Sequence, residues 1–229
     1  MQRVLLFTKT TGFRHESIPA GVAALAELAA AAGVVLDHSE DASVFGETSL
    51  ARYAAVVWLD VSGNVLDDEQ RAALLGFLRG GGGFAGIHSA SDAEWSWPEF
   101  EQIIGARFLS HPNDEKQFQT AQLRLVDAHH PSTRGLPDPW SWTDEWYVFT
   151  TNPSERVEVL LEVDESSYDV DGAPMGQRHP ISWHSTVGEG RTWYTALGHR
   201  DEDFADARYR AHLWGGIDSV LREPPFPAS

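Results

Sequence analysis

Four consecutive glycines, Gly80–Gly83, lead into the short apolar run Phe84–Ile87, which stops abruptly at the polar cluster His88–Asp92. A short run of this kind, without polar alternation, is typical of a strand that is buried on both faces of a parallel sheet. In such sheets, ligands bind at the carboxyl ends of the strands, where a tight turn leads into the next helix. The segment therefore predicts an α/β fold with a reactive side chain, His88, at the carboxyl end of a central strand.

Apolar runs and helical segments alternate through the first half of the chain. The helical segments begin after Ser17 and after Asp67, residue types that are favoured as N-caps, and Gln70 completes a capping box with Asp67. Strand–helix–strand alternation is typical of right-handed crossovers in a parallel, doubly wound sheet. Further buried strands are therefore expected at Arg3–Thr8 and Ala54–Asp60, and another strand is expected to begin at Val34–Asp37.

The second half of the chain has a different pattern. Residues 117–126 and 157–163 alternate polar and apolar side chains, which is typical of half-exposed antiparallel strands. The runs Pro180–His184 and Arg191–Leu197 flank a turn with two glycines and predict a hairpin. Antiparallel strands are therefore expected to extend the parallel core.

The domain organisation is simple. A last helix is expected at 204–221, and no stretch of the sequence has the composition of a linker between two domains. We therefore predict one domain over residues 1–222, in which a mostly parallel α/β core is completed by antiparallel additions from the second half. A Pro-rich tail is expected at 223–229.

Charge and cysteine content exclude several classes of function. The formal net charge is −17 at pH 7, whereas binding to nucleic-acid phosphates or to an anionic membrane surface requires clustered Lys and Arg side chains. The chain has no cysteine, which excludes disulfides, cysteine-ligated zinc sites and thiolate catalysis. No basic and apolar leader is visible, and no apolar run approaches the ~20 residues of a membrane span. We expect a cytoplasmic protein with neither nucleic acid nor a membrane as its partner.

Three histidines follow predicted strands at the same structural position. His15 follows the first strand, His88 ends the glycine-rich strand, and His199 follows Arg191–Leu197. Because the carboxyl ends of parallel strands share one rim of a sheet, residues that are distant in the sequence converge there. A single histidine at a strand end is more often an ordinary turn residue, but three in this position favour a ligand site.

A second group of polar and aromatic residues lies further along the chain. His111 lies in a loop that could close over the rim or could simply order its own turn. The run Asp144–Tyr147 holds two carboxyl groups, an indole and a phenol, and aromatic faces can stack on pyranose rings while carboxylates bind hydroxyl groups. Alternation along a strand would turn Glu145 and Tyr147 to one side and their two neighbours to the other, so only one pair can face a pocket. A packed aromatic cluster with exposed acids is the alternative.

Short motifs spread in order over most of the chain are Gly12–Ile18, Gly81–Asp92, Gly105–Phe108, His111–Pro112, Asp144–Tyr147, Pro180–Trp183, Gly188–Arg191 and Gly198–His199. Together these motifs resemble the ThuA-like family of trehalose-utilisation proteins. The resemblance implies a flavodoxin-like, class I glutamine amidotransferase-like fold. Such a fold is a three-layer sandwich with a mostly parallel central sheet, here with antiparallel additions in the second half.

The resemblance also bears on the chemistry. The amidotransferase relatives use a Cys–His–Glu triad at the strand-to-helix elbow, but here His88 stands at the nucleophile position and the chain has no cysteine. Glutamine hydrolysis by that route is therefore excluded. The resemblance implies a role in disaccharide or keto-sugar catabolism, with a sugar dehydrogenase as a partner in the same pathway.

We therefore expect a carbohydrate-processing enzyme that uses acid–base chemistry on a disaccharide or keto-sugar. A ketone acidifies the adjacent C–H, so isomerisation or elimination needs a base, an acid and a group that holds the enolate oxygen. His88 is the expected acid or base, with Glu145 and His199 as further catalytic residues. The expected substrate-binding residues are His15, Arg14, Asp92, His111, Tyr147 and Trp183.

Other readings of the same residues stay open. His15, His88 and His199, with Glu145 or Asp92, could hold a divalent ion such as Zn²⁺ with an open coordination position. A non-catalytic sugar-binding or regulatory module would explain the missing nucleophile and the tryptophans equally well, but it would not need several converging histidines. The oligomeric state is also open, with a homodimer as the common arrangement.

Overall fold

The computed structural model describes residues 1–221, and the Pro-rich tail predicted at 223–229 lies outside the described residues. The main feature is a nine-stranded sheet in the order β2-β1-β3-β4-β11-β10-β9-β6-β7, accompanied by a small sheet of β5 and β8. The strands are β1 (Arg3–Phe7), β2 (Val35–Ser39), β3 (Ala55–Leu59), β4 (Gly83–Ile87), β5 (Phe108–Ser110), β6 (Phe118–Leu125), β7 (Trp140–Glu145), β8 (Val148–Phe149), β9 (Glu158–Val163), β10 (Pro180–Val187) and β11 (Gly190–Thr195).

The strand directions divide the large sheet into two parts. β2, β1, β3, β4 and β11 run parallel to one another. From β11 onward, β10, β9, β6 and β7 each pair antiparallel to the preceding strand. The predicted α/β fold, with a mostly parallel sheet and antiparallel additions from the second half, is therefore confirmed, and β10 and β11 form the predicted hairpin.

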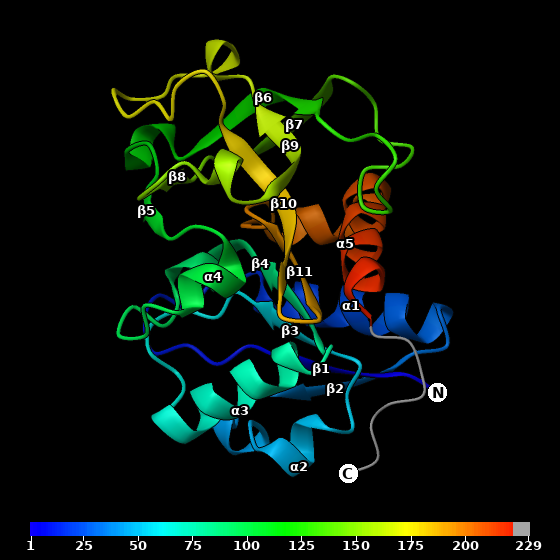
Figure 1. Ribbon diagram of the computed structural model, residues 1–229. Coiled ribbons are helices and arrows are strands. Elements are labelled where there is room, and N and C mark those ends of the chain that lie inside the picture. The colour runs from blue at the N-terminus through cyan, green and yellow to red at the C-terminus, as the bar shows by residue number, and fades with distance from the viewer. Residues whose placement is uncertain (222–229) are drawn as a thin grey trace.

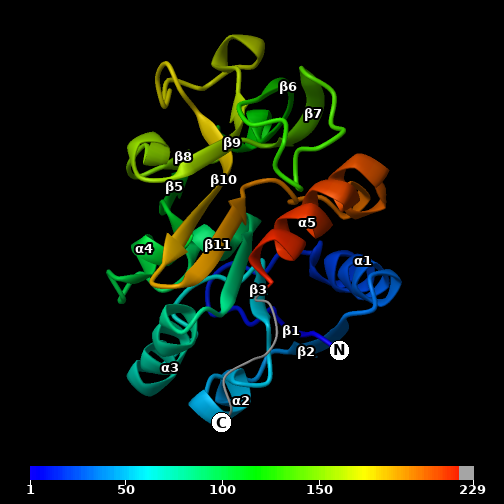
Figure 2. The same cartoon turned by 45° about the vertical axis from the view of Figure 1, so that its right-hand side comes forward.

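Helices cover both faces of the parallel part, which gives three layers (Figures 1 and 2). α1 and α5 pack together on one face, whereas α3 and α4 lie on the other. Among residues 1–221, no helix is both long and apolar enough to cross a membrane. The α-helices are α1 (Ile18–Ala31), α2 (Glu47–Leu50), α3 (Asp68–Arg79), α4 (Phe100–Ile104) and α5 (Ala207–Val220), and the 3₁₀ helices are η1 (Ala42–Val44), η2 (His88–Asp92), η3 (Asp114–Lys116), η4 (Pro153–Glu155), η5 (Glu165–Ser167) and η6 (Asp201–Ala205).

The two predicted helix starts have different outcomes. The Asp67 carboxylate accepts the Gln70 N–H at 2.9 Å, and the Gln70 side chain accepts the Asp67 N–H at 3.0 Å, so the capping box is present. Ser17 precedes α1, but its backbone is already helical and its side chain forms no cap. Its hydroxyl donates instead to Asp60 Oδ2 at 3.1 Å. The prediction of a Ser17 cap is therefore wrong, because a buried carboxylate takes the hydroxyl.

The glycines before β4 allow close packing at the centre of the fold. A Cβ atom on Gly83 would lie 2.1 Å from the carbonyl oxygen of Val220 at the end of α5. Real Cβ atoms do not approach backbone oxygens so closely, and only glycine lets α5 end directly beside the strand. The core continues on the opposite face, where Trp58 of β3 stacks on Phe100 of α4 with ring centroids 5.0 Å apart.

The antiparallel strands extend the sheet beyond the helical layers. In Figure 1, β6, β7 and β9 lie at the top of the molecule, and β1, β2 and β3 lie near the bottom. The chain returns from this extension to the carboxyl ends of the parallel strands. Glu145, the last residue of β7, consequently lies 3.1 Å from the His199 ring that follows β11.

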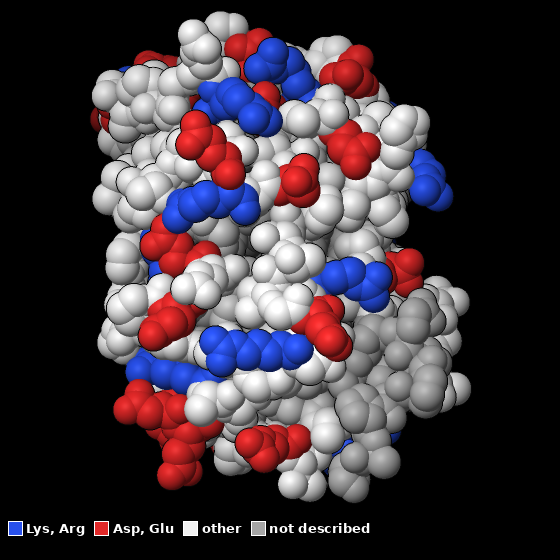
Figure 3. All heavy atoms as spheres, in the orientation of Figure 1, with Lys and Arg blue, Asp and Glu red and all other residues white. Residues whose placement is uncertain are grey.

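The surface carries charges of both signs. On the face drawn in Figure 3, Lys and Arg side chains are interspersed with Asp and Glu. Arg156 and Glu101, for example, form an ion pair with a distance of 3.1 Å between Arg156 Nη1 and Glu101 Oε1. This mixture accords with a chain whose net charge of −17 is distributed over the sequence and not concentrated in one block. The expectation that neither nucleic acid nor a membrane is a partner stays a prediction.

Candidate active site

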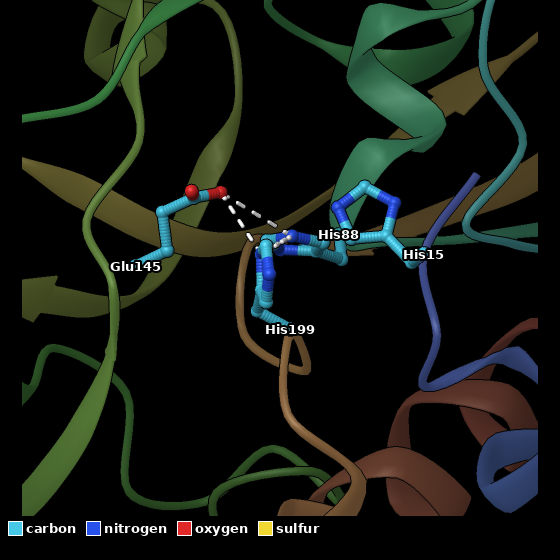
Figure 4. A group of neighbouring side chains, drawn as sticks. All are labelled: His15, His88, Glu145 and His199. Carbon is cyan, nitrogen blue, oxygen red and sulfur yellow. Dashed lines mark hydrogen bonds and ion pairs between the residues drawn. The ribbon is translucent and has the colours of Figure 1, made fainter. Parts of the chain in front are cut away.

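The structure brings together the three histidines that follow parallel strands (Figure 4). The ring centroid of His15 lies 4.7 Å from that of His88 and 4.7 Å from that of His199. The His88 and His199 centroids are 5.0 Å apart. His15 comes from the loop after β1, His88 from the end of β4, and His199 from the segment after β11. The convergence follows from the parallel directions of these strands.

His88 occupies a strained turn between β4 and η2. Its φ angle is +50°, in the left-handed region that favours glycine. The Tyr194 hydroxyl donates to the His88 carbonyl oxygen at 2.9 Å and thereby supports this conformation. Strain of this kind persists only where surrounding contacts hold it, and it often marks a functional turn. The backbone thus turns at His88 as at a nucleophile elbow, with imidazole as the side chain.

The hydrogen bonds of His88 define its tautomer. Nδ1 lies 2.7 Å from the Ala196 carbonyl oxygen, which can only accept, so Nδ1 carries the proton. Burial lowers the pKa of His88, so the ring is neutral and Nε2 holds a lone pair. The Tyr147 hydroxyl lies 2.9 Å from Nε2 and donates to it, since burial raises the pKa of Tyr147 well above its usual value.

His88 lies beneath the cavity and not in its wall. Its side chain has no exposed surface, and Nε2 is surrounded by Tyr147, by His199 Nδ1 at 3.1 Å and by Glu145 Oε2 at 3.6 Å. The prediction that His88 is the acid or base in contact with substrate therefore needs correction. In this structure His88 reaches a cavity ligand only through its neighbours.

Glu145 and His199 form a buried ionic pair at the cavity. Burial by itself would raise the pKa of Glu145, but the hydrogen bond from His199 and the charge of His199 outweigh it and lower the pKa to about 2. Burial would lower the pKa of His199, but the hydrogen bond with Glu145, 3.1 Å long, outweighs this effect and raises the pKa. The pair therefore favours a carboxylate beside an imidazolium.

The run Asp144–Tyr147 divides between two sides, as alternation predicts. Glu145 and Tyr147 face the cavity. Asp144 accepts the backbone N–H groups of Gly198 at 2.9 Å and His199 at 3.3 Å, and so holds the segment that carries His199. The alternative of a packed aromatic cluster with exposed acids does not apply, because both carboxylates are buried and hydrogen-bonded.

A cavity of about 480 Å³ opens above these residues. Six of the residues predicted for the site line it, and His111 among them lies 3.3 Å from Glu145 Oε1. Burial raises the pKa of Asp92, which also accepts the Trp95 indole N–H at 2.9 Å. The residues that line the cavity are Phe13, His15, Ser89, Asp92, Phe108, His111, Asp114, Gln117, Glu145, Tyr147 and His199.

Sequence reasoning missed three polar side chains of this cavity, those of Ser89, Asp114 and Gln117. The Ser89 hydroxyl is buried and has no hydrogen-bond partner within residues 1–221, and its position directly after His88 is the signal that could have identified it. Gln117 Nε2 donates to Glu145 Oε1 at 2.6 Å. Nothing in the sequence around Gln117 indicates this contact, which depends on the order of the antiparallel strands.

Two predicted substrate-binding residues lie elsewhere. Arg14 is half exposed and pairs with Glu40 at 2.7 Å, and it does not line the cavity. Trp183 of β10 is buried, donates its indole N–H to the Ile104 carbonyl oxygen at 2.9 Å and packs on Tyr194. Both predictions need correction, because an ion pair directs Arg14 outward and the face of β10 that carries Trp183 is covered by α4.

His15 has an incomplete set of contacts. Its side chain is buried, and Nδ1 has no hydrogen-bond partner within residues 1–221. Burial, together with the charge of His199, lowers the pKa of His15 to about 2, so the ring is neutral. One ligand atom each from His15, His88, Glu145 and His199 lies within 4.8 Å of every other, so these four residues could hold a metal ion.

Solved structures with the same fold include two ThuA-like proteins. One, from Bacteroides uniformis, is 23% identical with a TM-score of 0.77, and the match covers 94% of this chain and 89% of that one. The other, from Parabacteroides merdae, is 21% identical with a TM-score of 0.69, and the match covers 98% and 93%. A β-galactosidase from Rahnella sp. R3 contains a similar fold in 33% of its chain, matched by 99% of this chain at 15% identity and a TM-score of 0.59.

These likenesses, at 23% identity or less, concern the fold. No curated protein matches the sequence. A family model described as trehalose utilisation (ThuA) matches residues 3–218, which is nearly the whole chain. The match spans the strand-end histidines and the segment with Glu145. The protein therefore belongs to the ThuA family.

Proposed function

We propose that the protein is an enzyme that transfers a proton at a carbon next to the carbonyl group of a disaccharide or keto-sugar. The observation that carries the proposal is the Glu145–His199 pair, which is buried on one side and faces a cavity of about 480 Å³ on the other. An imidazolium held by a carboxylate is a strong hydrogen-bond donor in a site of low polarity. A carbonyl oxygen is the group that such a donor activates.

His199 is assigned the role of polarising the sugar carbonyl. Its Nδ1 is engaged by Glu145 and His88, and Nε2 has no hydrogen-bond partner within residues 1–221. This leaves Nε2–H for the carbonyl oxygen of a ligand in the cavity. The Ser89 hydroxyl, also without a protein partner among these residues, is a second donor for the same oxygen. Two donors resemble the arrangement that stabilises an enolate.

Asp92 is assigned the role of general base. It lines the cavity, and burial raises its pKa toward the range in which a carboxylate accepts protons from carbon most effectively. In the proposed step, Asp92 takes the proton of the C–H bond next to the carbonyl, and the electron pair of that bond forms the enolate. Return of this proton to the former carbonyl carbon, with the hydroxyl proton of the adjacent carbon passing to the enolate oxygen, moves the carbonyl group by one carbon and isomerises the sugar. In the alternative elimination, the enolate expels a β-oxygen substituent, which takes the proton from Asp92 and leaves as an alcohol, and an unsaturated ketone remains.

Aromatic side chains support a carbohydrate as the ligand. Phe13, Phe108 and Tyr147 line the cavity, and Phe13 is 66% exposed, which leaves its face available for a ligand. Aromatic faces contact the C–H faces of pyranose rings. Gln117 and His111 add polar atoms at the same wall for sugar hydroxyl groups. Membership of the trehalose-utilisation family supports this class of ligand.

A sugar-binding module without chemistry is the alternative function. It would use the same aromatic and polar wall, but it would not need a carboxylate and an imidazole held beside each other below the surface. Association with a sugar dehydrogenase, a cytoplasmic location and a homodimeric state remain predictions alongside this proposal. None of them is required for the proton-transfer step.

Proton exchange in D₂O tests the proposal directly. Disaccharides and their keto derivatives would be incubated with the protein, and the C–H signals next to the carbonyl would be followed by proton NMR. We expect loss of one such signal, and a fall of about 100-fold to 10,000-fold in its rate in Asp92→Asn and in His199→Gln. The exposed Glu189→Gln variant serves as the control and should retain the rate. Binding without exchange or conversion of any of these sugars would favour the non-catalytic module.

A further inference from the structure

We infer that His15, His88, His199 and Glu145 form a binding site for one divalent transition-metal ion, with Zn²⁺ as the best-fitting member. The inference deepens the proposed function and rests on it for the role of the ion. With the ion bound to Nδ1, His199 would be a neutral imidazole, and the ion would take the place of the imidazolium in polarising the carbonyl oxygen. The binding site itself depends only on the positions of the four side chains. In Figure 4 the Glu145 carboxylate points toward the rings of His88 and His199, and the His15 ring lies beside them.

The distances within this group match those around a tetrahedral ion. Bonds of about 2.0–2.1 Å to nitrogen and oxygen place neighbouring ligand atoms about 3.3 Å apart. His88 Nε2 lies 3.1 Å from His199 Nδ1, and Glu145 Oε2 lies 3.1 Å from His199 Nδ1 and 3.6 Å from His88 Nε2. These three atoms therefore form one face of such a tetrahedron. A ligand atom of His15 lies within 4.8 Å of all of them.

The hydrogen bonds around the group leave these atoms available to an ion. The Ala196 carbonyl accepts the His88 Nδ1 proton, which directs the Nε2 lone pair into the group. Gln117 donates to Glu145 Oε1 and leaves Oε2 on the side of the histidines. Orientation of ligands by outer carbonyl and amide groups is a regular feature of metal sites in proteins. Tyr147, which donates to His88 Nε2, would give up this bond to the ion.

His15 is the third imidazole of the group. Its side chain is buried, and its Nδ1 has no hydrogen-bond partner within residues 1–221. The rings of Phe13, His88 and His199 pack edge to face against the His15 ring. None of these contacts gives Nδ1 a hydrogen bond. One ring nitrogen of His15 lies within 4.8 Å of a ligand atom of each of the other three residues, and this nitrogen is the one available to an ion.

The donor set specifies the class of ion. Three imidazoles and one carboxylate suit Zn²⁺, Co²⁺, Ni²⁺ or Fe²⁺, whereas Mg²⁺ and Ca²⁺ prefer oxygen ligands. Because His15, His199 and Glu145 line the cavity, a further coordination position can point into it. This position is where a sugar carbonyl oxygen or a water molecule would bind.

Metal analysis of the full-length protein, purified without a histidine tag, tests the site without any sugar. After removal of metals with a chelator, calorimetric titration with Zn²⁺ should show one ion per chain, and Mg²⁺ should show no binding. The variants His15→Gln and Glu145→Gln should each bind Zn²⁺ at least about 100-fold more weakly. The exposed His129→Gln variant should bind as the unchanged protein does, and thermal unfolding would verify that each variant is folded.

Substitution with Co²⁺ gives a readout that does not depend on variants. Visible absorption of Co²⁺ bound to the unchanged protein should indicate four or five ligands that include imidazoles, and one equivalent of Zn²⁺ should abolish it. Failure of the unchanged protein to retain stoichiometric Zn²⁺ or Co²⁺, or equal binding by His15→Gln and His129→Gln, overturns the metal site. Sugar exchange at an unchanged rate in the chelated protein would refute the role of the ion and leave the proposed function standing.

Discussion

Asp144 accepts the backbone N–H of Gly198 at 2.9 Å and thereby ties the last antiparallel strand, β7, to the segment after β11. The same carboxylate accepts the N–H groups of Glu145 and His199 and the indole N–H of Trp142. All four of these groups are N–H groups that donate hydrogen bonds to the carboxylate. Asp144 is therefore a positioning residue that aligns both members of the Glu145–His199 pair without touching the cavity.

Asp144→Asn should weaken this alignment. The amide NH₂ group would face backbone donors, so at least one of them would lose its acceptor in a buried place. We expect a loss of about 3 kcal/mol in the free energy of unfolding, measured by urea denaturation. The exposed Ser141→Ala change on the same strand should alter stability by less than about 0.5 kcal/mol. Equal stability of Asp144→Asn and the unchanged protein would contradict the assigned role.

Gly198 itself allows the approach of Tyr209. Its φ angle is +118°, and a Cβ atom at this position would lie 2.1 Å from Tyr209 Oη. Gly198→Ala should therefore cost about 2–4 kcal/mol of stability, through backbone strain and through the clash. Denaturant unfolding would measure the loss.

A double-mutant cycle separates these two causes. Tyr209→Phe removes the atom that clashes and also the hydrogen bond to the Leu197 carbonyl oxygen, 2.9 Å long. Combined with Gly198→Ala, it should cost at least about 1 kcal/mol less than the sum of the single changes. Strict additivity would mean that the backbone conformation alone requires glycine at position 198.

The parallel core and its rim could be predicted from the sequence. Continuous apolar runs indicated strands buried on both faces, and strands of one direction bring residues as distant as His15 and His199 to the same rim. The glycine run before β4 and the polar cluster after it placed His88 at the turn. The convergence of His15, His88 and His199 could thus be predicted from a few local sequence patterns.

The contacts made by the second half could not be predicted in the same way. Glu145 meets His199 only because the order β11-β10-β9-β6-β7 returns the end of β7 to the rim. Alternation shows which residues share a face, but it does not show what covers that face. The sequence therefore does not show that α4 covers Trp183 or that Gln117 reaches Glu145.

The buried His212 should make the stability of the protein depend on pH. Its Nδ1 donates to the Ser132 carbonyl oxygen at 2.8 Å, and the Thr195 hydroxyl lies 3.0 Å from Nε2 and donates to it, so the ring is neutral. Burial lowers its pKa from 6.5 to about 4. Between these values the unfolded chain binds the proton and the folded protein does not. The stability from this residue is therefore complete above pH 6.5 and is lost as the pH falls toward 4.

Unfolding free energies at pH 7.5 and pH 4.5 would test this dependence. We expect the difference between the two pH values to be smaller by about 2–3 kcal/mol in His212→Gln than in the unchanged protein. His129→Gln, at an exposed position, should leave the difference unchanged. An identical difference in all three proteins would show that His212 does not contribute to it.

The buried Asp60 should make the stability depend on pH in the opposite direction. It follows β3 and is fully buried, with Oδ2 accepting the Ser17 hydroxyl and Oδ1 without a hydrogen-bond partner within residues 1–221. Burial raises its pKa from 3.8 to about 7. Between these values the folded protein holds a proton that the unfolded chain releases. The stability from this residue is therefore complete below pH 3.8 and is lost as the pH rises through 7.

Asp60→Asn should remove this loss of stability at high pH, because the amide stays neutral. The amide oxygen can still accept the hydrogen bond from the Ser17 hydroxyl. Asparagine also tolerates the φ angle of +52° at this position. Relative to the unchanged protein, the variant should gain stability between pH 4 and pH 8, by up to about 4 kcal/mol. The exposed Asp218→Asn variant serves as the control, and urea denaturation at a series of pH values gives the measurement. A constant stability difference across this range would show that Asp60 is ionised in the folded protein throughout.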